Sequence, residues 1–246
     1  MERNGSNMNT IKFDKGSVRM VAHRGVSGLE KENTCSAFVA AGNRSYFGIE
    51  TDVHVTSDGK YIIIHDDSTA RVCGDKLIVE ETTFETLRAL RLKDVDGERG
   101  RSDLRLPELT EYLGICKKYE KTAVLELKNR MSAEHVSTIA GIVKDMGMFD
   151  STVFISFSMD NLIDLRAAYP QANAQFLTEE LNKALLDKLA ELKLDLDVYY
   201  PCLTPELIAY AHGKNITVNC WTVNDPEDAE HLVKWGVDMI TSNILE

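Results

Sequence analysis

The chain has 246 residues, of which 43% are hydrophobic, and a formal net charge of −11 from 28 basic and 39 acidic side chains. This length suits one large or two small domains, and the apolar content is enough for a substantial core, so we favour one domain. The negative charge would repel nucleic acid and anionic membrane surfaces. We therefore expect no nucleic-acid partner and no stable membrane association, and an anionic substrate must be attracted locally.

The first 18 residues are polar and lack the apolar segment of a secretory signal, and no later stretch approaches the length of a membrane span. Five scattered cysteines without CxxC spacing are typical of free thiols in a reducing compartment. We therefore predict a cytoplasmic protein. Residues 17–246 are expected to form a single domain, and residues 1–16 are set apart as an N-terminal arm, with disorder as one expectation for them.

Apolar runs rich in β-branched residues predict eight strands, with helical patterns between them. Ser132, Thr204 and Asp225 are expected to cap three of the helices. In chain order, the strands are expected at residues 18–22, 48–53, 122–127, 152–156, 174–177, 196–199, 216–221 and 237–241. The helices are expected at residues 33–44, 107–119, 133–146, 159–168, 180–192, 205–212 and 226–235.

The alternation of strand and helix predicts an α/β fold with parallel strands and right-handed crossovers. Eight such units in about 250 residues favour a closed (β/α)8 TIM barrel. The alternative is an open doubly wound sheet, which more often has five or six strands and a Gly-rich phosphate loop after the first strand. Residues 23–28 (HRGVSG), which follow the first strand, match neither of the common Gly-rich phosphate motifs.

Two features depart from regular alternation. Residues 68–106 separate the second strand from its helix, are dense in charge towards their end, and contain one helical stretch near residues 84–92. We interpret them as a small insertion on the face of the barrel where loops carry function. Only five residues follow the last expected strand, so the eighth helix is expected to be absent or supplied by the N-terminal arm.

Three acidic side chains lie on predicted strands that a parallel barrel buries on both sides. Glu50 and Asp52 are two residues apart, so both point to one face of their strand, and Glu126 with Lys128 repeats this spacing. Buried unpaired carboxylates would cost several kcal/mol, and a bound cation explains them most simply. Oxygen ligands favour Mg²⁺ or Ca²⁺ over zinc. The alternative is a salt-bridge network with Arg24 or Lys128.

Two histidines are expected at the same rim of the barrel. His23 ends the first strand, and His65 follows the apolar run at residues 61–64. Imidazoles titrate near neutrality, so these two side chains could form an acid and base pair, with Asp66 as a candidate to orient His65. A structural histidine at a strand end is the alternative for each.

Three further residues are expected near this rim. Arg24 offers a planar fork suited to phosphate oxygens, with a surface arginine as the alternative. Trp221 ends the seventh strand and is expected either to form an apolar pocket wall or to pack within the barrel. His54 shares a strand face with the acidic pair and is expected in the pocket wall rather than as a ligand.

Taken together, these motifs resemble the glycerophosphodiester phosphodiesterase family. The resemblance covers about residues 20–243 in the family's order, which makes it specific although no single motif is. It is carried by His23-Arg24-Gly25, Glu32-Asn33-Thr34, residues 48–53 (GIETDV), residues 56–59 (TSDG), His65-Asp66, residues 106–109 (LPEL), Glu126-Leu127-Lys128, residues 156–158 (SFS), residues 221–224 (WTVN) and residues 236–238 (GVD).

This resemblance implies a barrel with a small insertion after its second strand. It implies a divalent cation, Mg²⁺ or Ca²⁺, held by the residues that match the family's ligands, Glu50, Asp52 and Glu126. His23 and His65 match the family's general acid and base histidines. The cation would position a hydroxyl and neutralise charge on the phosphoryl oxygens.

The resemblance also implies that Arg24 and Lys128 contact the phosphate. The expected reaction is hydrolysis of a glycerophosphodiester, a small-molecule substrate, to sn-glycerol 3-phosphate and an alcohol. In the family's proposed route, the glycerol 2-hydroxyl attacks phosphorus, and water then opens the cyclic phosphate. The sequence departs from the family's pattern at Asn243, where Asp is common, and in the insertion, which leaves the alcohol open.

Two other functions remain as alternatives. One is a phospholipase D-like phosphodiesterase that forms a cyclic phosphate from a lysolipid. The other is a noncatalytic phosphodiester-binding barrel, which should have lost a histidine or a carboxylate of the set, whereas all of them are present. The native metal, the oligomeric state and the order in which the histidines act do not follow from the sequence.

Overall fold

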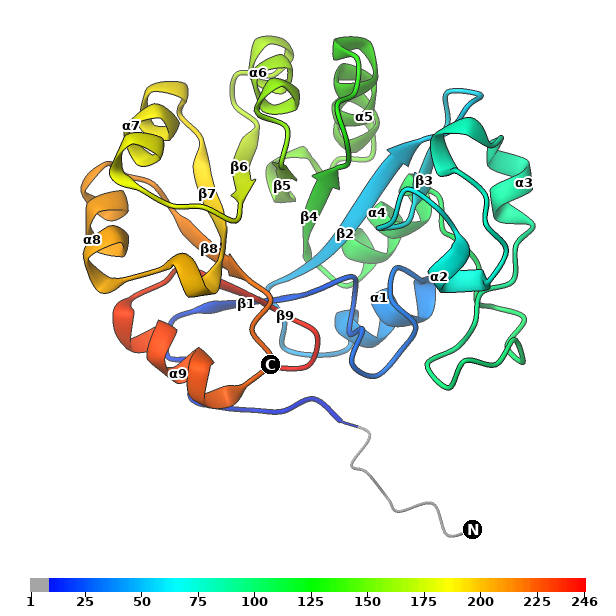
Figure 1. Cartoon of the computed structure of the whole chain (residues 1–246), viewed down its shortest axis with the longest axis horizontal. Coiled ribbons are helices and arrows are strands. Elements are labelled where there is room, and N and C mark those ends of the chain that lie inside the picture. The colour runs from blue at the N-terminus through cyan, green and yellow to red at the C-terminus, as the bar shows by residue number, and fades with distance from the viewer. Residues whose placement is uncertain (1–8) are drawn as a thin grey trace, which may run out of the picture.

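The computed structural model describes residues 9–246, and residues 1–8 of the expected N-terminal arm lie outside the described residues. Within residues 9–246, eight parallel strands form a closed barrel, because β1 pairs with both β9 and β2 (Figure 1). The (β/α)8 barrel predicted from the alternation is thus confirmed. In barrel order the strands are β1 (Arg19–Ala22), β9 (Met239–Ser242), β8 (Val218–Trp221), β7 (Asp195–Tyr199), β6 (Asn173–Thr178), β5 (Thr152–Ser156), β4 (Thr122–Leu127) and β2 (Gly48–Val55).

One further strand was not predicted. β3 (Tyr61–Ile63) runs antiparallel to the end of β2, with Val53 opposite Ile63. A run of only three residues after a turn has too few alternations to distinguish a strand from a loop. After β3, the Ile64 N–H donates to the Asp52 carbonyl at 3.1 Å, which brings His65 to the level of the acidic residues on β2.

The barrel helices pack outside the strands (Figure 1). As predicted, Ser132, Thr204 and Asp225 cap three of them, each side chain accepting a hydrogen bond from a backbone N–H of the first turn. The helices are α1 (Cys35–Gly42), α4 (Leu109–Lys118), α5 (Ala133–Asp145), α6 (Met159–Ala168), α7 (Lys183–Leu192), α8 (Pro205–Gly213) and α9 (Pro226–Trp235). Two short 3-10 turns, η2 (Phe149–Ser151) and η3 (Tyr200–Cys202), lie between helices and strands.

An extended segment takes the place of a helix after β9. In the described residues no helix follows β9, and Ile11 instead forms a parallel bridge with Leu245. The Ile11 N–H donates to the Ile244 carbonyl at 3.0 Å, and the Glu246 N–H donates to the Ile11 carbonyl at 2.9 Å. The two described ends of the chain therefore lie side by side.

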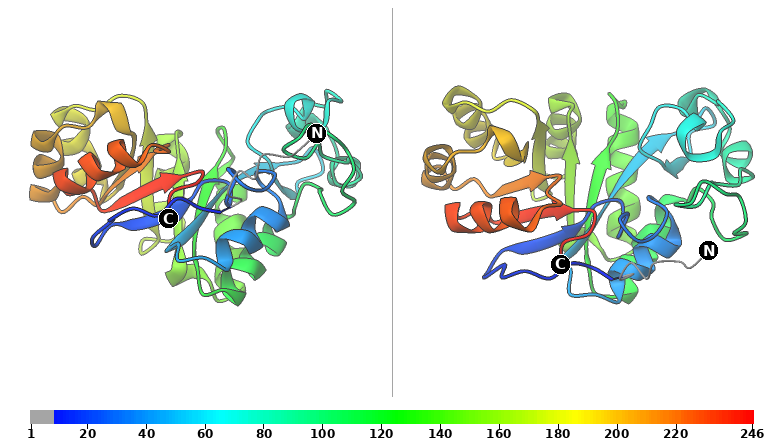
Figure 2. Two further views of the ribbon diagram at one scale, coloured as in Figure 1. Left: turned by 90° about the horizontal axis from the view of Figure 1, so that it is seen from below. Right: turned by 60° about the horizontal axis from the view of Figure 1, so that its bottom comes forward.

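Residues 68–106, called the insertion below, stand at the side of the barrel opposite α7 and α8 (Figures 1 and 2). The insertion contains α2 (Ala70–Cys73), η1 (Val79–Glu81) and α3 (Phe84–Arg88). Together with Ile62 and Ile64 of the preceding segment, it forms a hydrophobic core separate from that of the barrel, so it is held as a compact unit rather than as a loose loop. This core comprises Ile62, Ile64, Val72, Cys73, Val79, Phe84, Leu87, Leu92, Leu104 and Leu106.

The interior of the barrel is apolar in part. A cluster of five buried apolar side chains occupies one part of it, and buried charged side chains from β2 and β4 occupy another. In the part of the chain that the structure describes, no helix is long and apolar enough to cross a membrane. All five cysteines are free thiols. The interior cluster comprises Val21, Val124, Ile155, Leu177 and Met239.

Candidate active site

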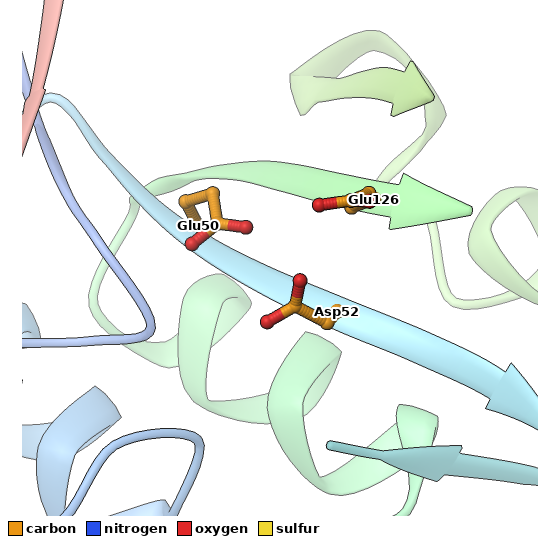
Figure 3. Close-up of side chains that lie close together, drawn as sticks. All are labelled: Glu50, Asp52 and Glu126. Atoms are coloured by element: carbon orange, nitrogen blue, oxygen red, sulfur yellow. The ribbon is translucent and has the colours of Figure 1, made fainter. Parts of the chain in front are cut away.

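Three buried acidic side chains meet inside the barrel, and we call them the carboxylate group (Figure 3). Asp52 on β2 and Glu126 on β4 are paired residues of neighbouring strands, and Glu50 lies two residues before Asp52 on the same face. Their exposed fractions are 4% for Glu50, 1% for Asp52 and 6% for Glu126. One oxygen of each lies within 4.8 Å of the others. The sequence-based expectation that these carboxylates converge is met.

The partners of the carboxylate group neutralise it only in part. Lys128 Nζ lies 2.9 Å from Glu126 Oε1 and 3.6 Å from Asp52 Oδ1, and Arg24 Nε lies 3.6 Å from Asp52 Oδ2. The backbone N–H of Arg24 donates to Glu50 Oε2 at 2.8 Å. Three carboxylates thus face two cationic side chains, and Asp52 Oδ1 is buried with no hydrogen-bond partner among the described residues.

The electrostatics of the carboxylate group favour a further positive charge. Burial, and then the charge on Asp52, raise the pKa of Glu50 and of Glu126 above the ordinary range. Burial also acts to raise the pKa of Asp52, but the charges on Arg24 and Lys128 outweigh it and hold that pKa below the usual value. The unpaired Asp52 oxygen and the all-oxygen donor set fit a hard divalent cation.

His23, directly after β1, is held by a neutral partner. Its Nδ1 lies 2.6 Å from Asn243 Oδ1, which also accepts a hydrogen bond from Ser27 Oγ at 2.9 Å. Because an amide oxygen only accepts, Nδ1 carries the proton and Nε2 keeps its lone pair. Burial, reinforced by the charge on Arg24, lowers the pKa of His23 to about 4. His23 is therefore a neutral imidazole at neutral pH.

His65 has the same tautomer but a charged partner. Its Nδ1 lies 2.7 Å from Asp66 Oδ1, so Nδ1–H donates to the carboxylate and Nε2 is again free to act. Burial, together with the charges on Arg24 and Lys128, lowers the pKa of His65, although the charge on Asp52 and the hydrogen bond to Asp66 oppose this shift. The expectation that Asp66 orients His65 agrees with this contact. The protonated form is thus better stabilised at His65 than at His23.

Arg71 connects the insertion to both sides of this site. It lies in α2, where its Nε and Nη2 donate to the two oxygens of Asp66 at 2.7 and 3.0 Å. Its Nη1 and Nη2 also donate to Glu32 at 2.5 and 2.9 Å, and Glu32 accepts from Arg24 Nη1 at 2.9 Å. The side chains of His65 and Arg24 are therefore held through one guanidinium that the sequence analysis did not single out.

A cavity of about 90 Å³ collects the predicted residues. Six of the eight predicted site residues line the cavity. The other two lie just behind the lining, where Lys128 contacts Glu126 and Asp52 contacts Arg24. Trp221 lines the cavity and packs against Phe157 and Tyr199, with ring centroids 5.7 and 5.6 Å away. We call these three the aromatic rim, because Phe157 and Tyr199 are exposed. The predicted residues in the lining are His23, Arg24, Glu50, His65, Glu126 and Trp221.

The structure corrects one expectation and adds a residue. His54 does not line the cavity; it is fully buried, and its Nδ1 lies 3.1 Å from Glu80 Oε1 in η1. His54 lies on the same face of β2 as Glu50. At this end of the strand, however, β3 pairs with β2 and Glu80 of the insertion contacts the His54 ring. Asp197 on β7 does line the cavity and was missed. Its signal was available, since an acidic residue on a doubly covered strand needs the same explanation as Glu50.

Comparisons with known proteins identify the family. A family model described as "Glycerophosphoryl diester phosphodiesterase family" matches residues 23–246. The glycerophosphodiester phosphodiesterase of Caldanaerobacter subterraneus is 26% identical over 227 residues, which cover 91% of this chain and 93% of that protein.

Two solved structures show the same architecture. A glycerophosphodiester phosphodiesterase from Parabacteroides distasonis is 28% identical with a TM-score of 0.76, covering 92% of this chain and 93% of that one. An Oleispira antarctica phosphodiesterase, solved in complex with its product sn-glycerol-3-phosphate, shares the fold with a TM-score of 0.86 at 23% identity and covers 92% and 93%. Because the family match extends over nearly the whole chain, this protein belongs to the glycerophosphoryl diester phosphodiesterase family of phosphoric diester hydrolases.

Proposed function

We propose that this protein hydrolyses glycerophosphodiesters to sn-glycerol 3-phosphate and an alcohol, with two histidines as acid and base beside a carboxylate-bound divalent cation. One observation carries the proposal: His23 and His65, both with Nδ1 engaged and Nε2 free, line the same cavity as Glu50 and Glu126. Proton transfer at two points of one substrate requires two such groups in one cavity. Family membership supports the class of reaction.

The carboxylate group would hold the cation, which we propose to be Mg²⁺ or Ca²⁺ because every donor is a carboxylate oxygen. When bound, a divalent cation neutralises charge that develops on the phosphoryl oxygens and lowers the pKa of a bound hydroxyl. The backbone N–H of Arg24 and the side chain of Asn33 orient the carboxylates, donating to Glu50 at 2.8 Å and to Asp52 at 2.7 Å. The ligand oxygens are thus positioned before the cation binds.

Arg24 and Lys128 would bind the phosphate. Both side chains are largely buried, with exposed fractions of 17% and 12%, and both approach the carboxylate group. Arg24 Nε is buried and has no hydrogen-bond partner in the described part of the chain, so a donor remains available. A buried guanidinium beside an ammonium group supplies the local attraction that an anionic diester needs in a chain of net charge −11.

The two histidines would divide the proton transfers. His23 is neutral at neutral pH, so its Nε2 would accept the proton of the glycerol 2-hydroxyl as that oxygen bonds to phosphorus. His65, whose protonated form Asp66 stabilises, would donate a proton to the departing alcohol oxygen. The cyclic phosphate would then be opened by water with the roles reversed. Each histidine ends in the protonation state in which it began.

The size of the cavity favours a glycerophosphodiester over a lysolipid. Its volume of about 90 Å³ is small beside the roughly 300 Å³ or more of a pocket for a drug-sized molecule. A glycerol phosphate moiety suits this space, whereas an acyl chain on the glycerol would have to leave it. The departing alcohol would lie toward the exposed aromatic rim, where Phe157 and Tyr199 face solvent.

The reaction is tested by ³¹P NMR with purified protein, glycerophosphocholine or glycerophosphoethanolamine, and added Mg²⁺ or Ca²⁺. We expect the diester signal to be replaced by that of sn-glycerol 3-phosphate. Accumulation of a cyclic phosphate from lysophosphatidylcholine instead would support the lysolipid alternative, and no turnover of any diester would support a noncatalytic barrel.

The cation is tested separately, by exhaustive chelation followed by readdition. We expect EDTA to abolish turnover and a single divalent cation to restore it. Undiminished turnover in excess EDTA would refute the cation assignment without touching the reaction itself. A variant of one proposed ligand, Glu126→Gln, tests the same assignment, because it removes one carboxylate charge with little change of side-chain volume. It should raise the cation concentration needed for half-maximal rate by about 10- to 100-fold.

A further inference from the structure

Asp197 lines the cavity but takes no part in the carboxylate group. It lies in β7 with an exposed fraction of 2%. In the barrel order, β7 is four strands away from β2 and therefore faces it across the interior. Among the described residues, the group of three acidic side chains whose oxygens lie within 4.8 Å of one another comprises Glu50, Asp52 and Glu126 and does not include Asp197. Its presence at the opposite wall needs another explanation.

The Asp197 carboxyl has an open hydrogen-bonding position. Its Oδ1 is buried and finds no hydrogen-bond partner within residues 9–246. The polar side chains beside it bond with one another instead, since Asn219 donates to Gln175 Oε1 at 3.2 Å and Thr241 donates to Asn219 Oδ1 at 3.3 Å. Buried polar atoms are nearly always paired, so a ligand group in the cavity is the partner that this oxygen lacks.

The chemistry of Asp197 selects a hydroxyl group as that partner. Burial raises the pKa of Asp197 well above the ordinary value, and the charge on Glu126 acts in the same direction. An ionised carboxylate would repel a phosphate oxygen, which has no proton to donate, and a neutral carboxyl could offer that oxygen only its single O–H. A hydroxyl can bond to the carboxyl in either of its forms.

We propose that Asp197 binds the terminal hydroxyl of the glycerol moiety and thereby selects diesters whose glycerol carries no further substituent. This inference rests on the proposed function. With the phosphate at Arg24 and Lys128 and the 2-hydroxyl at the cation, the terminal hydroxyl is the polar group that remains for the opposite wall. A substituent on that oxygen would remove its proton and add bulk to a cavity of about 90 Å³.

The test compares two substrates in wild-type protein and in Asp197→Ala. Glycerophosphocholine has the terminal hydroxyl, whereas 2-hydroxypropyl phosphocholine lacks it but keeps the 2-hydroxyl and the choline. We expect wild-type kcat/KM to be about 10- to 100-fold higher for glycerophosphocholine, the ratio expected for one buried hydrogen bond. In Asp197→Ala this ratio should fall to about threefold or less, with the loss confined to glycerophosphocholine.

Two further variants keep the test decisive. Asp197→Asn retains the volume and hydrogen-bonding capacity, so it should keep most of the preference even if the alanine variant is poorly folded. The control residue is Asp195, two residues earlier on β7, whose carboxylate lies outside the cavity and accepts a hydrogen bond from the Thr217 N–H at 2.7 Å. Asp195→Ala should keep the full preference for glycerophosphocholine. An unchanged ratio in Asp197→Ala, or an equal loss on both substrates, would overturn the inference.

A binding measurement separates this inference from the proposed function. Titration calorimetry compares sn-glycerol 3-phosphate with 2-hydroxypropyl phosphate, and it requires no turnover. We expect wild-type protein to bind the first more tightly by about 10-fold or more, and Asp197→Ala to bind both with similar affinity. If the protein turns over no diester but shows this binding pattern, the proposed function fails and the inference about Asp197 stands. Equal affinities in wild-type protein would refute it.

Discussion

Arg71 forms a bidentate ion pair with Asp66, the residue that holds His65: its Nε and Nη2 lie 2.7 and 3.0 Å from the two carboxylate oxygens. The same guanidinium donates to Glu32, which in turn accepts from Arg24. A fork of this kind fixes direction as well as distance. The insertion therefore contributes to the site by positioning a proposed acid and a proposed phosphate contact, in addition to covering one side of the barrel.

Removing this fork should impair turnover more than substrate binding. We expect Arg71→Ala to lower kcat by about 10- to 100-fold, because a displacement of roughly 1 Å at a reacting group costs about that much. Guanidinium ion added to the variant should restore part of the rate, which a merely structural role would not allow. Steady-state kinetics on glycerophosphocholine gives both values.

The matched control for this variant is Arg99→Ala. Arg99 lies in the same insertion and pairs with Asp75 at 3.1 Å, away from the cavity. It should leave kcat within about twofold, as expected for an exposed ion pair. Equal losses in the two variants would mean that Arg71 acts by holding the insertion together.

The same network predicts an acid-dependent contribution to stability. Burial acts to raise the pKa of Glu32, but the hydrogen bonds from Arg71 and Arg24 lower it to about 2, and the hydrogen bond from Arg71 lowers the pKa of Asp66 to about 2. Both folded-state values lie below the unfolded ones, near 4. The stabilisation is therefore fully present above about pH 5 and is lost as the pH falls toward 2.

Thermal unfolding of wild-type protein and of Arg71→Ala measures this contribution. The pairs are partly exposed, so we expect a difference of about 1 kcal/mol or less at pH 7, equivalent to about 2–4 °C in Tm. The difference should shrink steadily between pH 5 and pH 3. A difference in Tm that is independent of pH would show that the two carboxylates do not titrate with Arg71.

Much of this architecture could be predicted because its signals are local and repeated. Eight apolar runs separated by helical patterns predict a barrel, and Glu50, Asp52 and Glu126 stand out because charge is costly on a buried strand. β3 could not be predicted from three residues. The contact of Arg71 with Glu32 and that of Asn243 with His23 join segments far apart in the chain. Asp197 was accessible by the argument applied to Glu50, since both are acids on buried strands.

The two histidines should each be needed for turnover. We expect His23→Ala and His65→Ala to lower kcat by about 10²- to 10⁴-fold, the usual contribution of one positioned proton transfer. Circular dichroism and thermal unfolding should show that both variants are folded. His135→Ala is the control, because His135 contacts Tyr61 at 3.1 Å outside the cavity, and it should keep near wild-type turnover. A fully active His23 or His65 variant would remove that residue from the mechanism.

The neutral partner of His23 should set the acid limb of the pH–rate profile. Asn243 Oδ1 lies 2.6 Å from His23 Nδ1, and the pKa of His23 is lowered to about 4 mainly by burial. Asn243→Asp would place a negative charge against the imidazole and stabilise its protonated form, so the acid limb of kcat/KM should move upward by about 1–3 pH units. Asn243→Ala removes the anchor without adding charge and should lower the rate at every pH. If the Asn243→Asp profile coincides with the wild-type profile, His23 is not the group whose protonation stops the reaction.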